Sequence, residues 1–223
     1  MSSWGGFEEP QRLEPPSHGR YALNTLLIYA ESAIKYVENT VKYGSPNRPE
    51  DLAHIEGRYM RRLSWPATAP RDRAGMASLL DQVEIGRLSD GPLYTSTIRI
   101  RQLATLTKTS GVGTCIGLAA VACEYLLNKG LSGVALMGFN QCNHALVVLG
   151  LSSAPQAAEQ FSRTGAAPRS WGSGAVICDP WYYEWFDVSQ WRRKFPHIVN
   201  ATLNAQQLQG VPDMVSAKCL AYF

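Results

Sequence analysis

Residues 111–130 read GVGTCIGLAAVACEYLLNKG and decide much of the fold. The run from Cys115 to Lys129 carries small and apolar side chains at helical spacing, and Gly130 is the residue type that commonly follows a helix end. Apolar residues occupy nearly every side of this predicted helix, so we expect it to be buried. Three apolar runs follow with the length and composition of buried strands, at Gly133–Gly138, His144–Gly150 and Gly174–Cys178.

The residues before this helix are mostly helical in pattern. Tyr21–Tyr43 alternates apolar and charged faces at helical spacing, which predicts a long amphipathic helix that ends at the Gly and Pro residues of 44–49. Shorter helices are expected near Glu50–Met60 and at Ala74–Val83. Leu93–Thr107 alternates enough to favour a strand, alone or followed by a turn.

The residues after the third predicted strand complete an α+β pattern. We interpret 151–173, rich in Ser, Ala, Gln and Gly, as a surface excursion beside the candidate site. Tyr182–Phe186 is predicted to be a strand, and a helix is predicted to begin with Asp187 or Ser189 as its N-cap. The apolar stretch Met214–Phe223 is predicted to be a closing strand.

Composition limits the classes of protein to consider. The chain has 223 residues, of which 45% are hydrophobic and 17% charged, and its net charge is +3. We expect one domain at 21–223, helical over about 21–110 and carrying the chemistry over about 111–223, after a disordered tail at 1–20 that is a candidate export signal. The scattered, weakly positive charge gives no reason to expect a nucleic-acid partner, and no apolar run is long enough for a membrane span.

Cysteine usage and the N-terminal residues bear on the compartment. The five cysteines are odd in number and lack a CxxC pair, so we expect thiols in a reducing environment rather than a disulfide framework. The first residues lack the basic and apolar regions of a secretory signal peptide. This pattern fits a cytosolic protein and equally a protein exported by an injection apparatus.

Cys115, His144 and Asp179 form the candidate catalytic trio. A thiol at a helix start is favoured as the thiolate by the N–H groups there. Gly111 and Gly113 allow close backbone approach and predict N–H groups that could receive an oxyanion. A histidine at one strand start and a carboxylate at the end of the next can serve as base and orienter, so the trio predicts a thiol enzyme acting on an acyl bond.

Each member of the trio also has an ordinary structural interpretation. A cysteine in an apolar helix can be a core residue, a histidine on an apolar strand can be buried without a function, and an aspartate before proline is common in turns. A metal site is the main chemical rival, because Cys115, Cys142, His144 and Cys178 are all ligand types. Their spacing lacks the CxxC and HxxxH patterns, so we expect no metal and no other cofactor.

The motifs together resemble a known superfamily. A Gly/Thr-Cys helix, then His-Ala-Leu-Val-Val from His144, then Val-Ile-Cys-Asp-Pro-Trp ending at Trp181 resembles the papain-like and transglutaminase-like superfamily, most closely its bacterial effector and toxin thiol enzymes. The resemblance covers about residues 111–186. It implies a Cys helix packed on an antiparallel sheet with N-terminal helices beside it, and it implies Cys115 as nucleophile, His144 as base and Asp179 as orienter.

The sequence departs from this superfamily at two points. The insertion between His144 and Asp179 is longer than in ordinary transglutaminases, and the Gln that supplies the papain-type oxyanion hole is absent. The nearest upstream Gln is Gln102, thirteen positions before the cysteine (115 − 102 = 13). The oxyanion and substrate candidates are therefore the backbone around Gly113 and Cys115, with Gln102 or Asn143 as side-chain donors.

The resemblance implies attack on an amide carbonyl of a host protein through a thioester. The expected activity is glutamine or asparagine deamidation or transglutamination by an effector that is made in the bacterial cytoplasm and secreted into a host cell. A cysteine protease of the same fold is the alternative, and a small-molecule acyl transferase stays open. A further alternative is a non-catalytic binding module whose partner surface contains an aromatic cluster, Trp181, Tyr182, Tyr183, Trp185 and Trp191. The sequence leaves the oligomeric state undetermined.

Overall fold

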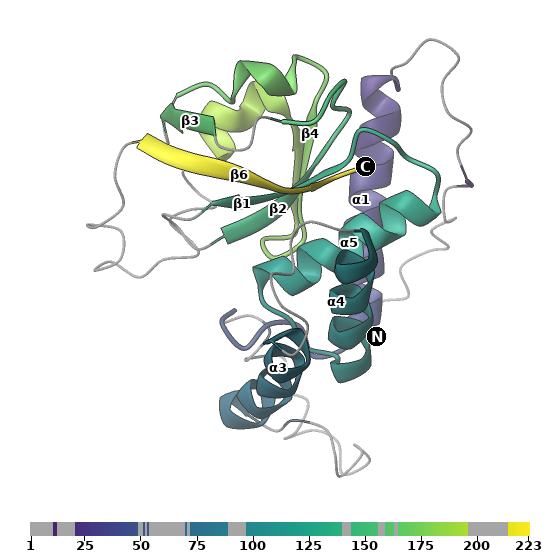
Figure 1. Cartoon of the computed structure of the whole chain (residues 1–223), viewed down its shortest axis with the longest axis vertical. Coiled ribbons are helices and arrows are strands. Elements are labelled where there is room, and N and C mark those ends of the chain that lie inside the picture. The colour runs from purple at the N-terminus through teal and green to yellow at the C-terminus, as the bar shows by residue number, and fades with distance from the viewer. Residues whose placement is uncertain are drawn as a thin grey trace.

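The fold is α+β, built on one antiparallel sheet of six strands in the order β3-β6-β1-β2-β4-β5 (Figure 1). The computed structural model describes residues 11–12, 21–48, 51, 53, 70, 72–88, 97–139, 144–155, 159–162, 165–195 and 214–223. The strands are β1 (Ala135–Phe139), β2 (His144–Leu149), β3 (Glu159–Ser162), β4 (Val176–Asp179), β5 (Glu184–Asp187) and β6 (Met214–Tyr222). Every predicted strand from residue 133 onward is confirmed except for shifts at its ends.

The described helices lie mostly before the sheet in the chain. They are α1 (Leu23–Thr40), α3 (Arg73–Leu88), α4 (Thr97–Ser110) and α5 (Cys115–Asn128). The predictions of the long first helix, of a helix within 74–83 and of a helix beginning at Cys115 are confirmed. Gly130 follows α5 with a φ of 86°, a conformation that favours glycine and ends the helix as predicted.

The central strands β1, β2 and β4 are buried on both faces of the sheet, which explains their continuous apolar runs. Successive residues of a strand point to opposite faces. In β2, Val147 and Leu149 belong to a core shared with α1, α4 and α5, whereas Leu146 and Val148 belong to a second core on the other face. All residues of β1, β2 and β4 are buried. A strand covered on both faces has no polar side, so the alternation typical of half-buried strands is lost.

The prediction of a strand at Leu93–Thr107 is wrong in its described part, where α4 runs from Thr97 to Ser110. The buried residues Ile100, Leu103, Ala104 and Thr107 recur at helical spacing and face α5. Isoleucines and threonines raise the strand propensity of this stretch. Packing against an apolar helix outweighs that local preference, because propensity differences are small beside buried contacts.

The interpretation of 151–173 as a surface excursion is wrong in part. Its described residues supply β3, which pairs with β6 at the sheet edge, and the buried Trp171. Trp171 packs edge-on against Trp191, with ring centroids 5.2 Å apart. The aromatic cluster is likewise not the exposed surface considered above, because Trp181 and Trp191 are buried and Tyr182, Tyr183 and Trp185 are half-buried. Their apolar area stabilises the fold instead.

Three other predictions concern the N-cap near residue 187, the segments at 1–20 and 50–60, and a membrane span. Asp187 is the N-cap of the short helix Val188–Gln190, with its side chain accepting from the Ser189 amide. The tail at 1–20, apart from residues 11–12, and most of the helix predicted at Glu50–Met60 lie outside the described residues. Among the helices that the structure describes, none has the length and apolar content needed to cross a membrane.

The contact between α4 and α5 depends on Gly117. A Cβ atom on Gly117 would lie 2.7 Å from Thr107 Oγ1, while Thr107 Cγ2 would lie 2.8 Å from a Cβ on Gly113. Thr107 is fully buried, and its hydroxyl makes no hydrogen bond within the described residues.

We expect Gly117→Ala to destabilise the protein by about 1–3 kcal/mol, because the clash outweighs the better helix propensity of alanine. In a Thr107→Ala background the clash is gone, so the same change should stabilise the protein instead. Chemical denaturation of the four proteins measures both effects. A destabilisation that persists in the Thr107→Ala background would place its cause elsewhere.

Candidate active site

The sheet register brings His144 and Asp179 to the same end of the sheet. β2 and β4 are antiparallel neighbours, with Val147 opposite Cys178. The start of β2, at His144, therefore lies beside the end of β4, at Asp179. Helix α5 packs on this sheet and begins at Cys115, so the trio converges from one helix and two strands.

His144 and Asp179 form a fully buried pair. His144 Nε2 lies 2.5 Å from Asp179 Oδ2, and both side chains have 0% relative exposure. This contact assigns the Nε2 proton to a hydrogen bond with the carboxylate and fixes the ring orientation. A charge-assisted hydrogen bond of this kind is stronger than one between neutral groups.

The second ring nitrogen of His144 faces a different partner. Nδ1 is buried and faces Cys115, whose side chain acts on the ring both by hydrogen bonding and by charge. Burial alone would lower the pKa of His144, but the Asp179 carboxylate and the nearby Cys115 thiol outweigh it and raise the pKa to about 10. The imidazole is therefore protonated at neutral pH, with the sulfur within its electrostatic reach.

Asp179 also organises the turn that follows it. Its Oδ1 atom accepts hydrogen bonds from the backbone amides of Trp181 and Tyr182, both at 3.1 Å. These two donors and His144 satisfy a carboxylate that would otherwise be costly to bury. Oδ2 therefore contacts His144, as expected of an orienter, while Oδ1 stabilises the turn, as expected of an aspartate before proline.

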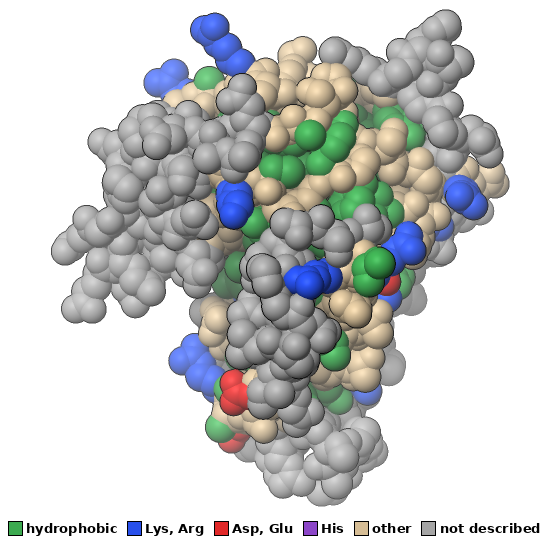
Figure 2. Space-filling model, in the orientation of Figure 1, with side chains coloured by type: hydrophobic (Ala, Val, Ile, Leu, Met, Phe, Trp, Pro, Cys, Tyr) green, Lys and Arg blue, Asp and Glu red, His purple; other side chains and the backbone are tan. Residues whose placement is uncertain are grey.

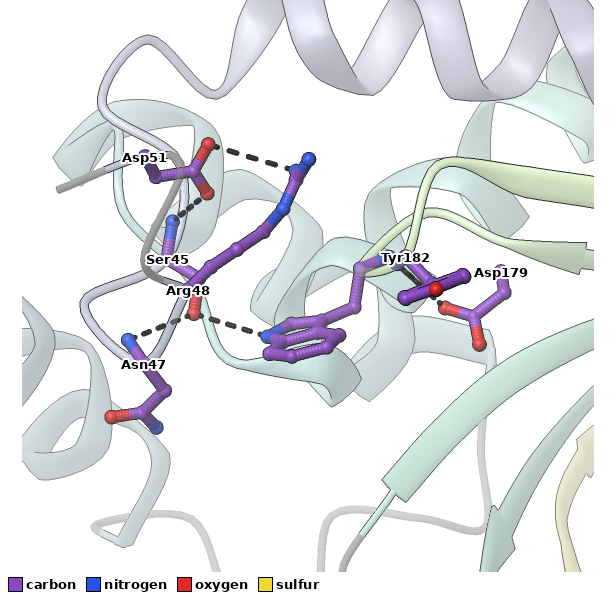
Figure 3. A network of polar contacts seen from close by, with 7 residues as sticks. Ser45, Asn47, Arg48, Asp51, Asp179 and Tyr182 are labelled. Carbon is purple, nitrogen blue, oxygen red and sulfur yellow. Dashed lines mark hydrogen bonds and ion pairs between the residues drawn. The ribbon is translucent and has the colours of Figure 1, made fainter. Parts of the chain in front are cut away.

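Trp181 covers the buried pair. Its ring lies edge-on to the His144 ring, with centroids 6.1 Å apart, and it is 6% exposed. The indole Nε1 donates to Ser45 Oγ at 3.3 Å, across 136 positions of sequence. Ser45 Oγ therefore accepts two hydrogen bonds, one from the indole and one from the backbone amide of Asn47 (Figure 3).

The four described cysteines fall into two groups by burial. Burial raises the pKa of Cys123 and of Cys178, which disfavours their thiolates. Cys115 and Cys219 are half-buried, and none of the four described cysteines forms a disulfide. Within the described residues, no three His, Cys, Asp or Glu side chains are grouped so as to hold a metal ion.

The oxyanion candidates have different outcomes. The expectation that Gly111 and Gly113 leave their amides available is wrong, because Gly111 N donates to Thr107 O and Gly113 N donates to Gly44 O. Gln102 is exposed on α4, and no described contact joins it to the trio. Asn143 and Cys142 lie outside the described residues. The Thr114 side chain does not cap α5, so the backbone at the Cys115 end of this helix stays the leading candidate.

Sequence reasoning missed the contribution of the segment after α1. Ser45 is 0% exposed and contacts the site through Trp181, yet it lies in a Gly-Ser-Pro-Asn stretch with the composition of an ordinary surface turn. Tyr183, in the same turn as Trp181, has a positive φ of 57°, which is uncommon for a residue other than glycine. Neither feature leaves a signal in the local pattern, because both depend on distant partners.

Comparisons of the chain with family models, with curated proteins and with solved structures find no match. On the face shown in Figure 2, Lys and Arg side chains are spread over the surface rather than gathered in one patch. The site geometry is therefore the main guide to function.

Proposed function

We propose that the protein is a Cys-His-Asp thiol enzyme of papain-like or transglutaminase-like architecture that attacks an amide carbonyl of a protein substrate. The buried His144–Asp179 pair beside Cys115 supports the proposal most strongly. A protonated imidazole stabilises a neighbouring thiolate, which is the nucleophilic form of cysteine. A histidine and a carboxylate buried together without a function would be a costly way to fill a core.

The reaction follows from the positions of the protons. In the proposed mechanism, the proton that the Cys115 thiol gives up is held on His144, and the sulfur attacks as the thiolate. Attack on a carboxamide carbon forms the C–S bond and moves charge to the carbonyl oxygen, which backbone N–H groups at the start of α5 would stabilise. His144 then donates its proton to the departing nitrogen, and the C–N bond breaks to give a thioester.

The second half of the reaction decides the product. Water gives one proton to His144 as it attacks, and the C–S bond breaks to restore the thiolate–imidazolium pair. The product is a carboxylic acid, which loses its second proton to solvent and becomes the carboxylate. A primary amine in place of water gives a crosslink. A carboxamide of glutamine or asparagine in a host protein is the proposed substrate, with secretion from a bacterium as the proposed route to it. Cleavage of a peptide bond by the same steps is the alternative product.

The proposal predicts that Cys115 is alkylated selectively. At about pH 6, iodoacetamide should modify Cys115 roughly 100-fold faster than Cys219, because in the described part of the chain an imidazolium lies beside Cys115 and favours its thiolate. Cys219 is the matched control, since both thiols are half-buried. Peptide mass spectrometry over time gives the two rates. Similar rates for both thiols would remove the main support for a catalytic role and favour a binding module.

A second measurement separates the products. Dimethylcasein and an extract of host cells are each incubated with wild type or with Cys115→Ala, in the presence and in the absence of a fluorescent alkylamine. A wild-type-only gain of about one dalton means deamidation, a fluorescent adduct means transglutamination, and shorter fragments mean proteolysis. Identical products from wild type and Cys115→Ala would contradict all three activities.

A further inference from the structure

We infer that the linking segment, defined as residues 43–48 and Asp51, holds the two halves of the proposed site in register, with Ser45 as a positioning residue that acts through Trp181. The inference rests on the proposed function. The segment follows α1 and belongs to neither the Cys115 helix nor the sheet. It nevertheless contacts the residues before the nucleophile and the residues after Asp179.

One side of the linking segment holds the residues that lead into α5. Tyr43 N donates to Gly111 O at 2.7 Å, and Gly113 N donates to Gly44 O at 3.0 Å. Gly44 and Val112 form an isolated parallel bridge. Val112 is 0% exposed. Two backbone hydrogen bonds within four residues of Cys115 hold the segment from which the helix begins, and so they help to position the sulfur.

The other side of the linking segment holds the turn after Asp179. Ser45 Oγ accepts from Trp181 Nε1, and the Arg48 guanidinium lies 3.6 Å from the centroid of the Tyr183 ring. Tyr183 carries the positive φ noted above, so this turn is strained and needs surrounding contacts to persist. The same turn presents the Trp181 and Tyr182 amides to Asp179.

The linking segment is itself fixed by Asp51. Asp51 Oδ2 accepts from Ser45 N at 2.8 Å, and Asp51 Oδ1 lies 3.6 Å from Arg48 Nη1 (Figure 3). Gly44 has a φ of +72°, and a Cβ atom there would lie 2.3 Å from Asp51 Oδ2. A side chain at position 44 is therefore excluded, and the carboxylate occupies the space that the glycine leaves.

This arrangement links Ser45 to the imidazole in two steps. Ser45 fixes the rotation of the Trp181 ring, and that ring covers His144 from one side. Without the Ser45 acceptor, a buried indole N–H loses its partner and the ring is no longer held in one orientation. The His144 ring then loses a fixed edge-on neighbour, so the imidazole is held less firmly in the orientation that lets it favour the Cys115 thiolate.

The test compares pH profiles of Cys115 alkylation by iodoacetamide in wild type, Ser45→Ala, Trp181→Phe and the double variant. Ser45→Ala should slow alkylation at about pH 6 by roughly tenfold and move the acid limb of the profile to higher pH. Trp181→Phe keeps a ring over His144 but removes the Nε1 donor. In that background Ser45→Ala should change the rate by less than about twofold, because the link is already broken.

Ser32→Ala is the matched control, since Ser32 is also a buried serine, and its hydroxyl donates to Ile28 O within α1 rather than to a residue of the site. It should leave the profile unchanged. If the profiles of Ser45→Ala and Trp181→Phe both match that of wild type, this inference is overturned and the proposed function is unaffected. The inference is also overturned if Ser45→Ala slows alkylation by the same factor at every pH, because a uniform effect indicates that iodoacetamide reaches Cys115 less easily and not that the imidazole has lost its position. If wild-type Cys115 reacts no faster than Cys219, the proposed function fails and the inference fails with it.

Discussion

Asp179→Ala is expected to destabilise the protein by about 3–5 kcal/mol, the cost of leaving one member of a buried ion pair without its partner. Asp179 is fully buried and accepts from His144, Trp181 and Tyr182, so its removal leaves three donors unsatisfied at once. Denaturant titration at neutral pH measures the change. A loss below about 1 kcal/mol would mean that these contacts contribute little to the folded state.

The same variant should lose the reactivity of Cys115. Without the carboxylate the imidazole is neither oriented nor held protonated, and we expect alkylation at about pH 6 to fall roughly 100-fold or more. Asp179→Asn separates orientation from charge, because an amide oxygen can still accept from the Trp181 and Tyr182 backbone. It should recover part of the stability but little of the reactivity. Wild-type reactivity in Asp179→Asn would show that the charge is not needed.

The second large effect concerns alkaline pH. The pKa of His144 is about 10 in the folded protein, above its ordinary value of 6.5, so the folded state holds the proton more tightly than the unfolded state does. The resulting stabilisation is fully present below pH 6.5 and is lost as pH rises through about 10. The free energy of unfolding should therefore fall over this range.

His144→Gln isolates this contribution, because the other titrating groups are common to both proteins. The difference in the free energy of unfolding between wild type and His144→Gln should shrink steadily as pH rises from about 6.5 to about 10. Denaturant titrations at several pH values provide the curve. A difference that is constant over this range would mean that His144 is not held protonated. In the variant, selective alkylation of Cys115 at low pH should also disappear.

The elements of the fold were largely predictable because their signals are local. The small-residue helix at Cys115 and the apolar strand at His144 each carry their own periodicity, and Gly130 marks its helix end by its backbone preference. The stretch that became α4 shows where this reasoning fails. Its β-branched residues favour a strand when considered alone, and only contact with α5 selects the helix that buries Ile100 and Leu103.

By itself, the sequence determined the α+β class and the start of α5 at a cysteine, and it predicted Cys115, His144 and Asp179 as a candidate set. These depend on residue type and spacing over a few positions. Only the tertiary structure decided that His144 and Asp179 meet at 2.5 Å, that the Gly113 amide is occupied by Gly44, and that Ser45 contacts Trp181. Each of these contacts joins residues far apart in the chain, and a hydrogen bond depends on distance and angle that no local pattern specifies.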